Sequence, residues 1–181
     1  MTQCLIKHSF ICGLSTFAIN FILAALKLQF VLLWTSNVMP GFVFAFIVAN
    51  ATKSKADLKS LLFILLSGGL YILVAWIATG YSFFGNKVYI CFPIASILGA
   101  TIMLLIYKLL LDNEFNFIAS LRYAFLTGLV SSILPVIGDL LNPSFDILDN
   151  SYWLALAFTL SIYIIWQPLF AWTIARQQGY R

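Results

Sequence analysis

The chain has 181 residues, of which 62% are hydrophobic and only 9% are charged, and its mean hydropathy is +1.01. A protein that faces water needs far more surface charge, so this composition excludes a soluble globular domain. The formal net charge of +4 does not indicate nucleic-acid binding, because the basic residues flank apolar segments instead of lining one binding face.

Apolar runs of about 20 residues recur along the chain, which is the length that a helix needs to cross a bilayer. We therefore expect an all-α fold: a polytopic integral membrane protein whose single domain, residues 1–181, is a compact bundle of six transmembrane helices. The predicted spans are 9–26, 30–50, 58–79, 88–111, 117–141 and 152–175.

The first predicted span carries a stripe of small and polar side chains. Gly13, Thr16, Asn20 and Ala24 follow one another at steps of three or four residues and therefore share one helical face. Such a face is expected to pack on other helices. Asn20 lies near mid-membrane, where its amide needs a partner; we favour an interhelical hydrogen bond over the alternative, the lining of a ligand cavity.

The second predicted span is interrupted. Trp34 and Asn37 belong to an interfacial, polar stretch that is followed by Pro40 and Gly41. Proline costs little at the start of a helix, because its missing N–H has no partner there. Two interpretations stay open: a helix that kinks at Pro40, or an irregular or re-entrant segment over residues 29–39 with a short helix that begins at Pro40. Irregular backbone is tolerated at membrane depth only where protein or a wet cavity surrounds it.

A basic loop, residues 51–60, precedes the third span. Within it Ser54 and Asp57 have the spacing of a capping box, which predicts that they open the helix over residues 58–79. The fourth span, residues 88–111, has Pro93 in its early turns.

The fifth and sixth spans each contain one candidate functional residue. Asp139 lies roughly 25 Å along the fifth helix from Arg122, at about 1.5 Å per residue, and so close to the outer headgroups. We expect a solvated aspartate at a helix end, with an acidic mouth that attracts cations as the alternative. In the sixth span Pro168 frees a backbone carbonyl, which predicts either a packing kink or a ligand contact for Gln167.

The distribution of basic residues predicts the orientation of the bundle. The side with both termini collects eight of them, and the opposite side has only Lys27 and Lys87. By the positive-inside rule both termini are expected in the cytoplasm, in a multi-pass protein of the inner or plasma membrane. The eight are Lys7, Lys53, Lys55, Lys59, Lys108, Arg122, Arg176 and Arg181.

No catalytic pattern is visible. The single histidine, His8, stands at the edge of the first span, which disfavours an intramembrane serine–histidine protease. HExxH, P-loop and GxSxG motifs are absent, and Cys4, Cys12 and Cys91 lack metal-binding spacing. We therefore expect no enzyme activity, no cofactor and no metal.

Six short-looped spans in 20.3 kDa resemble the layout of the substrate-binding S components of energy-coupling-factor importers. The layout is also similar to that of the rod-shape-determining membrane subunit of the cell-wall elongation machinery. The C-terminal run that contains Trp166-Gln167-Pro168 and Arg176-Gln177-Gln178 resembles the end of that family's chain. The first resemblance implies a membrane-embedded subunit that binds or transports a small molecule. The second implies a non-catalytic scaffold or assembly subunit of a larger envelope complex.

For the first function, we expect residues 29–41 to act as an outer plug over a ligand pocket lined by Asn20, Trp34, Asn37, Asp139 and Gln167. For the scaffold function, small residues would let partner helices approach closely, namely Gly68, Gly69, Ser96, Gly99, Gly128 and Ser132. The expected partners are the lipid bilayer and other membrane or cytoplasmic subunits, or a second copy of the chain, and not nucleic acid.

Overall fold

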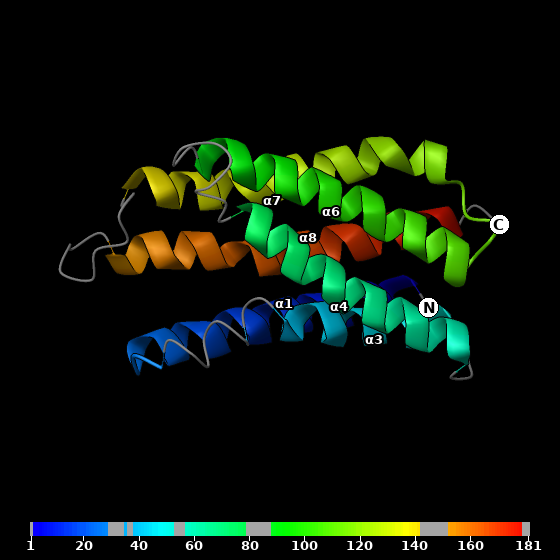
Figure 1. Cartoon of the computed structure of the whole chain (residues 1–181), viewed down its shortest axis with the longest axis horizontal. Coiled ribbons are helices and arrows are strands. Elements are labelled where there is room, and N and C mark those ends of the chain that lie inside the picture. The colour runs from blue at the N-terminus through cyan, green and yellow to red at the C-terminus, as the bar shows by residue number, and fades with distance from the viewer. Residues whose placement is uncertain are drawn as a thin grey trace.

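The computed structural model is built of α-helices and describes residues 2–28, 35, 38–52, 57–78, 88–141 and 152–178 (Figure 1). These residues form six helices and no strand, which confirms the predicted all-α fold. The helices are α1 (Thr2–Ala25), α3 (Met39–Thr52), α4 (Leu58–Ala78), α6 (Val88–Leu110), α7 (Phe117–Leu141) and α8 (Tyr152–Gln178).

The helices pack as a closed ring. Around it α1 contacts α8, α8 contacts α7, α7 contacts α6, α6 contacts α4, α4 contacts α3, and α3 returns to α1. Successive helices along the chain run in opposite directions, so the start of α1 and the end of α8 lie at the same end of the bundle (Figure 1). We call this the terminal end and the other the distal end.

Five of the six helices are long and apolar enough to cross a membrane, namely α1, α4, α6, α7 and α8. Large apolar side chains on their outer faces are about half exposed, for example Leu66 at 50% and Ile133 at 54%. Such a surface suits lipid and not water. The structure thus has the character of a multi-pass membrane protein.

The helix at the second predicted span is shorter than expected. It begins at Met39, directly before Pro40, and has 14 residues. At 1.5 Å per residue it is about 21 Å long, too short for a hydrocarbon core of about 30 Å. The described part of this span is thus a short helix that begins at Met39. Residues 29–34, 36 and 37, which decide between a kinked helix and an irregular segment, lie outside the described residues.

Local hydrogen bonds set several helix ends. Asp57 Oδ1 accepts the backbone N–H of Ser60 at 2.7 Å, so Asp57 is the N-cap residue of α4. In the predicted capping box Ser54 would have been the N-cap residue and Asp57 the third residue of the helix. Ser54 lies outside the described residues. α1 begins at Thr2, ahead of the predicted start at residue 9, because nothing in residues 2–8 breaks a helix. It ends at Ala25, and Lys27, with a φ of 57°, follows in a Schellman turn in which the Leu28 N–H donates to the Leu23 carbonyl at 3.0 Å.

Aromatic side chains fill the terminal half of the ring. Trp166 stacks on Phe170 with their ring centroids 5.0 Å apart, and Phe44 meets both rings edge-on. Nearer the terminal end, Tyr107 lies 5.1 Å from Phe115. This packing leaves the distal half of the ring as the place for a cavity.

Candidate functional site

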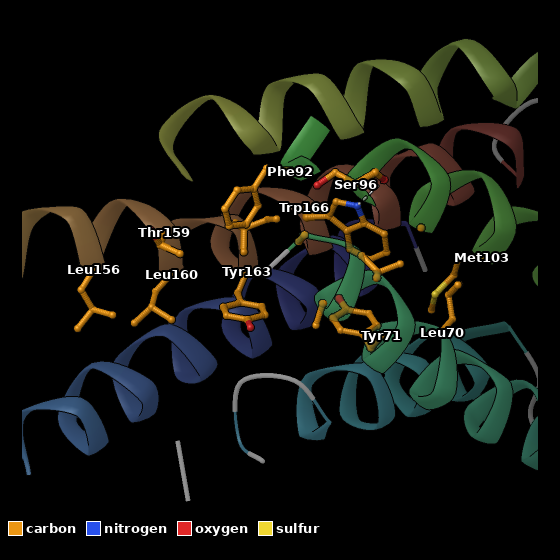
Figure 2. Close-up of a pocket in the computed structure, with 15 residues that line it drawn as sticks. Leu70, Tyr71, Phe92, Ser96, Met103, Leu156, Thr159, Leu160, Tyr163 and Trp166 are labelled. Carbon is orange, nitrogen blue, oxygen red and sulfur yellow. Dashed lines mark hydrogen bonds between the residues drawn. The ribbon is translucent and has the colours of Figure 1, made fainter. Parts of the chain in front are cut away.

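A cavity of about 280 Å³ lies inside the ring, where α4, α6 and α8 face one another (Figure 2). It is lined by fifteen residues, four of them aromatic: Tyr71, Phe92, Tyr163 and Trp166. Its aliphatic, small and polar lining consists of Leu70, Val74, Ala75, Ala78, Ser96, Gly99, Met103, Leu156, Thr159, Leu160 and Ile162.

The lining follows from helical periodicity. On α6 the lining positions are 92, 96, 99 and 103, and on α8 they include 156, 159, 160, 163 and 166, so each set forms one stripe. Figure 2 shows the α8 side chains in a row from Leu156 to Trp166, opposite residues of α4 and α6. The stripes occupy the C-terminal part of α4 and the N-terminal part of α8, and so the distal half of the bundle.

The cavity is apolar with a few polar atoms and no charged side chain among its lining residues. The Trp166 Nε1–H points at the Ser96 carbonyl at 3.5 Å, and the Thr159 hydroxyl donates to the Ala155 carbonyl at 2.9 Å. The Ser96 hydroxyl is buried and has no hydrogen-bond partner. A bound molecule would therefore meet mainly ring faces and aliphatic carbon.

Gln167 lies one helical turn beyond Tyr163, at the inner end of the α8 row. Its side chain is fully buried, at 0% exposure, and neither its amide nitrogen nor its amide oxygen has a hydrogen-bond partner. The Tyr71 hydroxyl and the Cys12 thiol lie beside it without meeting hydrogen-bond geometry. A buried amide whose two polar atoms lack hydrogen-bond partners lowers the stability of the fold.

Asn20, in contrast, has a hydrogen-bond partner for each polar atom of its side chain. Its Nδ2 donates to the Thr16 carbonyl at 2.9 Å, and its Oδ1 accepts from the Thr35 hydroxyl at 2.7 Å. The side chain is fully buried and ties Thr35 to α1. The hydrogen-bonding interpretation of Asn20 thus accounts for its amide.

Asn20 also borders a second space, a groove of about 380 Å³ between α1 and α3. Several of its lining side chains open outward, such as Ile11 at 47% and Met39 at 55% exposure. These residues belong to the outer surface that suits lipid. We therefore treat the groove as a lipid-facing seam and the α4–α6–α8 cavity as the candidate site.

Asp139, another predicted site residue, does not line this cavity. Asp139 lies in the last turn of α7 and is 6% exposed, so it is not the solvated helix-end residue that was expected. Its neighbour Gly138 brings the α7 backbone close to Ala155 of α8, which helps to bury this turn. Trp34 and Asn37 lie outside the described residues.

Sequence reasoning missed the residues that make the cavity, chiefly Tyr71, Phe92 and Tyr163. Aromatic residues occur throughout apolar helices, so composition does not separate a cavity wall from a lipid-facing surface. The one available signal was the four-residue step from Tyr163 to Gln167, which places an aromatic and a polar group on one face. Among the described residues, no three His, Cys, Asp or Glu side chains gather to hold a metal.

Comparisons with models of known protein families, with curated proteins and with solved structures found no match to this chain. The functional argument therefore depends on the geometry of the cavity and of the groups beside it.

Proposed function

We propose that the protein binds a small, largely apolar molecule within the membrane, as the binding or transport subunit of a larger system. The observation that carries the proposal is the aromatic-lined cavity between α4, α6 and α8. An apolar protein cavity of about 150 Å³ already accepts benzene, so one of about 280 Å³ has room for a two-ring molecule.

The burial of about half of the lining supports a binding pocket. Eight lining residues are no more than 9% exposed: Leu70, Ala78, Phe92, Ser96, Met103, Leu156, Leu160 and Trp166. Ligand sites are typically such largely apolar pockets with a small number of polar groups. The cavity also lies in the distal half, which the orientation predicted from the sequence makes the outer half.

The alternative function, a scaffold subunit, draws less support from the structure. Its proposed contact residues are mostly used inside the chain, because Gly68 packs on Phe42, and a Cβ at Gly99 would come 2.9 Å from Val74 Cγ2. Gly69 has open space around it. Co-purification of a stoichiometric protein partner with an empty cavity would favour the scaffold function.

The first test is native mass spectrometry of the chain extracted gently from its own membrane. A small molecule retained on the chain supports the proposal and reveals its chemical class. A lipid, or no adduct at all, in repeated extractions that keep the fold intact contradicts it.

A cavity-filling variant provides the second test. Ser96→Leu adds an aliphatic side chain to the cavity and removes a buried hydroxyl without a partner. We expect it to weaken the binding of naphthalene by about tenfold, equivalent to about 1.4 kcal/mol, in dialysis against nanodiscs with empty nanodiscs as the blank. The matched control is Leu98→Phe, which adds volume on the exposed face of the same helix. Equal loss in both variants, or in neither, would argue against the cavity as the site.

A further inference from the structure

Two arginines and two aromatic rings form a cluster where the start of α7 and the end of α8 lie together, at the terminal end of the bundle (Figure 1). The rings of Tyr123 and Trp172 meet edge-on, with their centroids 5.4 Å apart. The Cζ atoms of Arg122 and Arg176 lie 4.7 Å and 5.1 Å from the centroid of the same ring, that of Tyr123. This arginine cluster thus holds two positive charges, one from each helix, on one tyrosine.

The chemistry of the arginine cluster suits a phosphate group. Arg122 is exposed, and its Nη2 donates to the Tyr123 hydroxyl at 3.0 Å. A guanidinium that stacks on a ring uses its face, whereas its N–H groups point outward from its edge. Those edge donors match the spacing of two phosphate oxygens. Both arginines keep their charge at any physiological pH.

The arginine cluster lies at the level of the lipid headgroups. α7 has 25 residues and is therefore about 37 Å long, which exceeds a hydrocarbon core of about 30 Å. Arg122 lies only about 8 Å along α7 from its start at Phe117, and Arg176 lies in the last turn of α8. Long arginine side chains at such positions extend their charged ends toward the headgroups.

An apolar lane on α7 runs from Arg122 toward the middle of the membrane. Positions 122, 126, 129 and 133 follow one another at steps of four, three and four, so they share one helical face. The side chains of Leu126, Leu129 and Ile133 are exposed on it. Acyl chains attached to a bound phosphate would cover this lane, whereas a soluble phosphate compound would gain nothing from it.

We propose that the arginine cluster and the apolar lane form a binding site for one anionic phospholipid, in the leaflet at the terminal end. The phosphate binds Arg122 and Arg176, and the acyl chains lie along α7. The site favours a lipid with a net negative charge, because the ammonium of a zwitterionic headgroup brings a third positive charge to the two arginines. The site lies on the outer surface, so this inference does not depend on the proposed function of the cavity.

A competition between two lipids provides the test. The purified protein in detergent receives equal amounts of phosphatidylglycerol and phosphatidylcholine with identical acyl chains, and native mass spectrometry counts the adducts of each. We expect phosphatidylglycerol adducts to exceed phosphatidylcholine adducts at least about fivefold, as the charge of one arginine near an anionic headgroup allows. Phosphatidylglycerol should also raise the midpoint of thermal unfolding more than phosphatidylcholine does. Equal numbers of the two adducts on the unmodified protein overturn the inference, whatever the variants do.

Substitutions at Arg122 assign the preference to the arginine cluster. We expect Arg122→Gln, at an exposed position, to bring the two adducts to within about twofold of each other. Arg122→Lys keeps the charge and loses the planar fork, so it should retain part of the preference. The matched control is Lys59→Gln, which removes one exposed charge from the same end of the bundle, on α4, two helices away from α7 around the ring. An equal loss in Arg122→Gln and Lys59→Gln would show a diffuse effect of net charge and overturn the inference.

Glycerol 3-phosphate, which carries a phosphate and no acyl chains, separates a lipid site from a site for soluble phosphates. In large excess it should leave the phosphatidylglycerol adduct unchanged within about twofold, because it cannot cover the apolar lane. Displacement of the lipid by glycerol 3-phosphate would overturn the assignment to a phospholipid. A phospholipid adduct that Arg122→Gln removes belongs to this outer site, and occupancy of the cavity is judged on the molecules that this variant still retains.

Discussion

Two buried amides show how differently one kind of side chain is used in this bundle. Asn20 and Gln167 are both fully buried. Asn20 has a partner for its nitrogen and for its oxygen, and it joins α1 to Thr35. Gln167 has a partner for neither atom. An unpaired amide in a dry core lowers stability, and such a cost is common where a binding site is built.

The backbone conformation of Lys27 also lowers the stability of the protein. It holds the left-handed position at the end of α1, with a φ of 57°, where glycine is the usual residue. We expect Lys27→Gly to stabilise the protein by about 1 kcal/mol, because the strain of a side chain in this conformation is relieved. For a chain of this size that raises the midpoint of thermal unfolding by about 2–4 °C. Lys27→Ala removes the charge and keeps the strain, so an equal gain with alanine would attribute the effect to the charge instead.

At the scale of the elements, close backbone approach decides which helices can pair. Gly13 of α1 lies against the backbone carbonyl of Tyr163 on α8, and Gly128 of α7 lies against the backbone of Ile97 on α6. Small residues at such crossings bring helices together in membranes, where burial of apolar surface alone gives little drive. The close approach of α1 and α8 at Gly13 also brings Cys12 beside Gln167.

A pair of glycine substitutions tests this account. A Cβ at Gly13 would collide with the Tyr163 carbonyl oxygen, which cannot move without shifting α8. We expect Gly13→Ala to destabilise the protein by about 1–3 kcal/mol, the usual cost of overpacking, with a matching fall in the thermal midpoint. Gly69→Ala, on α4, meets nothing within 4 Å and should stabilise by up to about 1 kcal/mol. The same sign for both variants would rule out the close contact as the cause.

At the scale of the whole molecule, the ring of helices has an apolar belt and a polar terminal end. Arg176 lies over the rings of Tyr123 and Trp172, with its Cζ 5.1 Å and 5.2 Å from their centroids, and Arg122 donates to the Tyr123 hydroxyl at 3.0 Å. Arginine with tyrosine and tryptophan is typical of a membrane interface. The cluster fits the predicted placement of the terminal end at the cytoplasmic face.

The native cysteines test that orientation. Cys4 is exposed near the terminal end, whereas Cys12 and Cys91 are buried. A membrane-impermeant maleimide should therefore label the protein in inverted vesicles and leave it unlabelled in intact cells, because the positive-inside rule places Cys4 in the cytoplasm. Lys87→Cys, in the loop predicted on the other side, should add labelling in intact cells. Labelling of the unmodified protein in intact cells would reverse the predicted orientation.

The sequence by itself determined the class of the fold, because apolar runs long enough to cross a bilayer permit few structures other than helices. It also identified Pro40 as a helix start and Gln167 as a residue to examine. Only the tertiary structure decided which apolar faces meet each other, since lipid-facing and protein-facing surfaces have the same composition. That arrangement placed Tyr71, Phe92 and Tyr163 around a cavity, paired Asn20 with Thr35, buried Asp139, and left the amide of Gln167 without a hydrogen-bond partner.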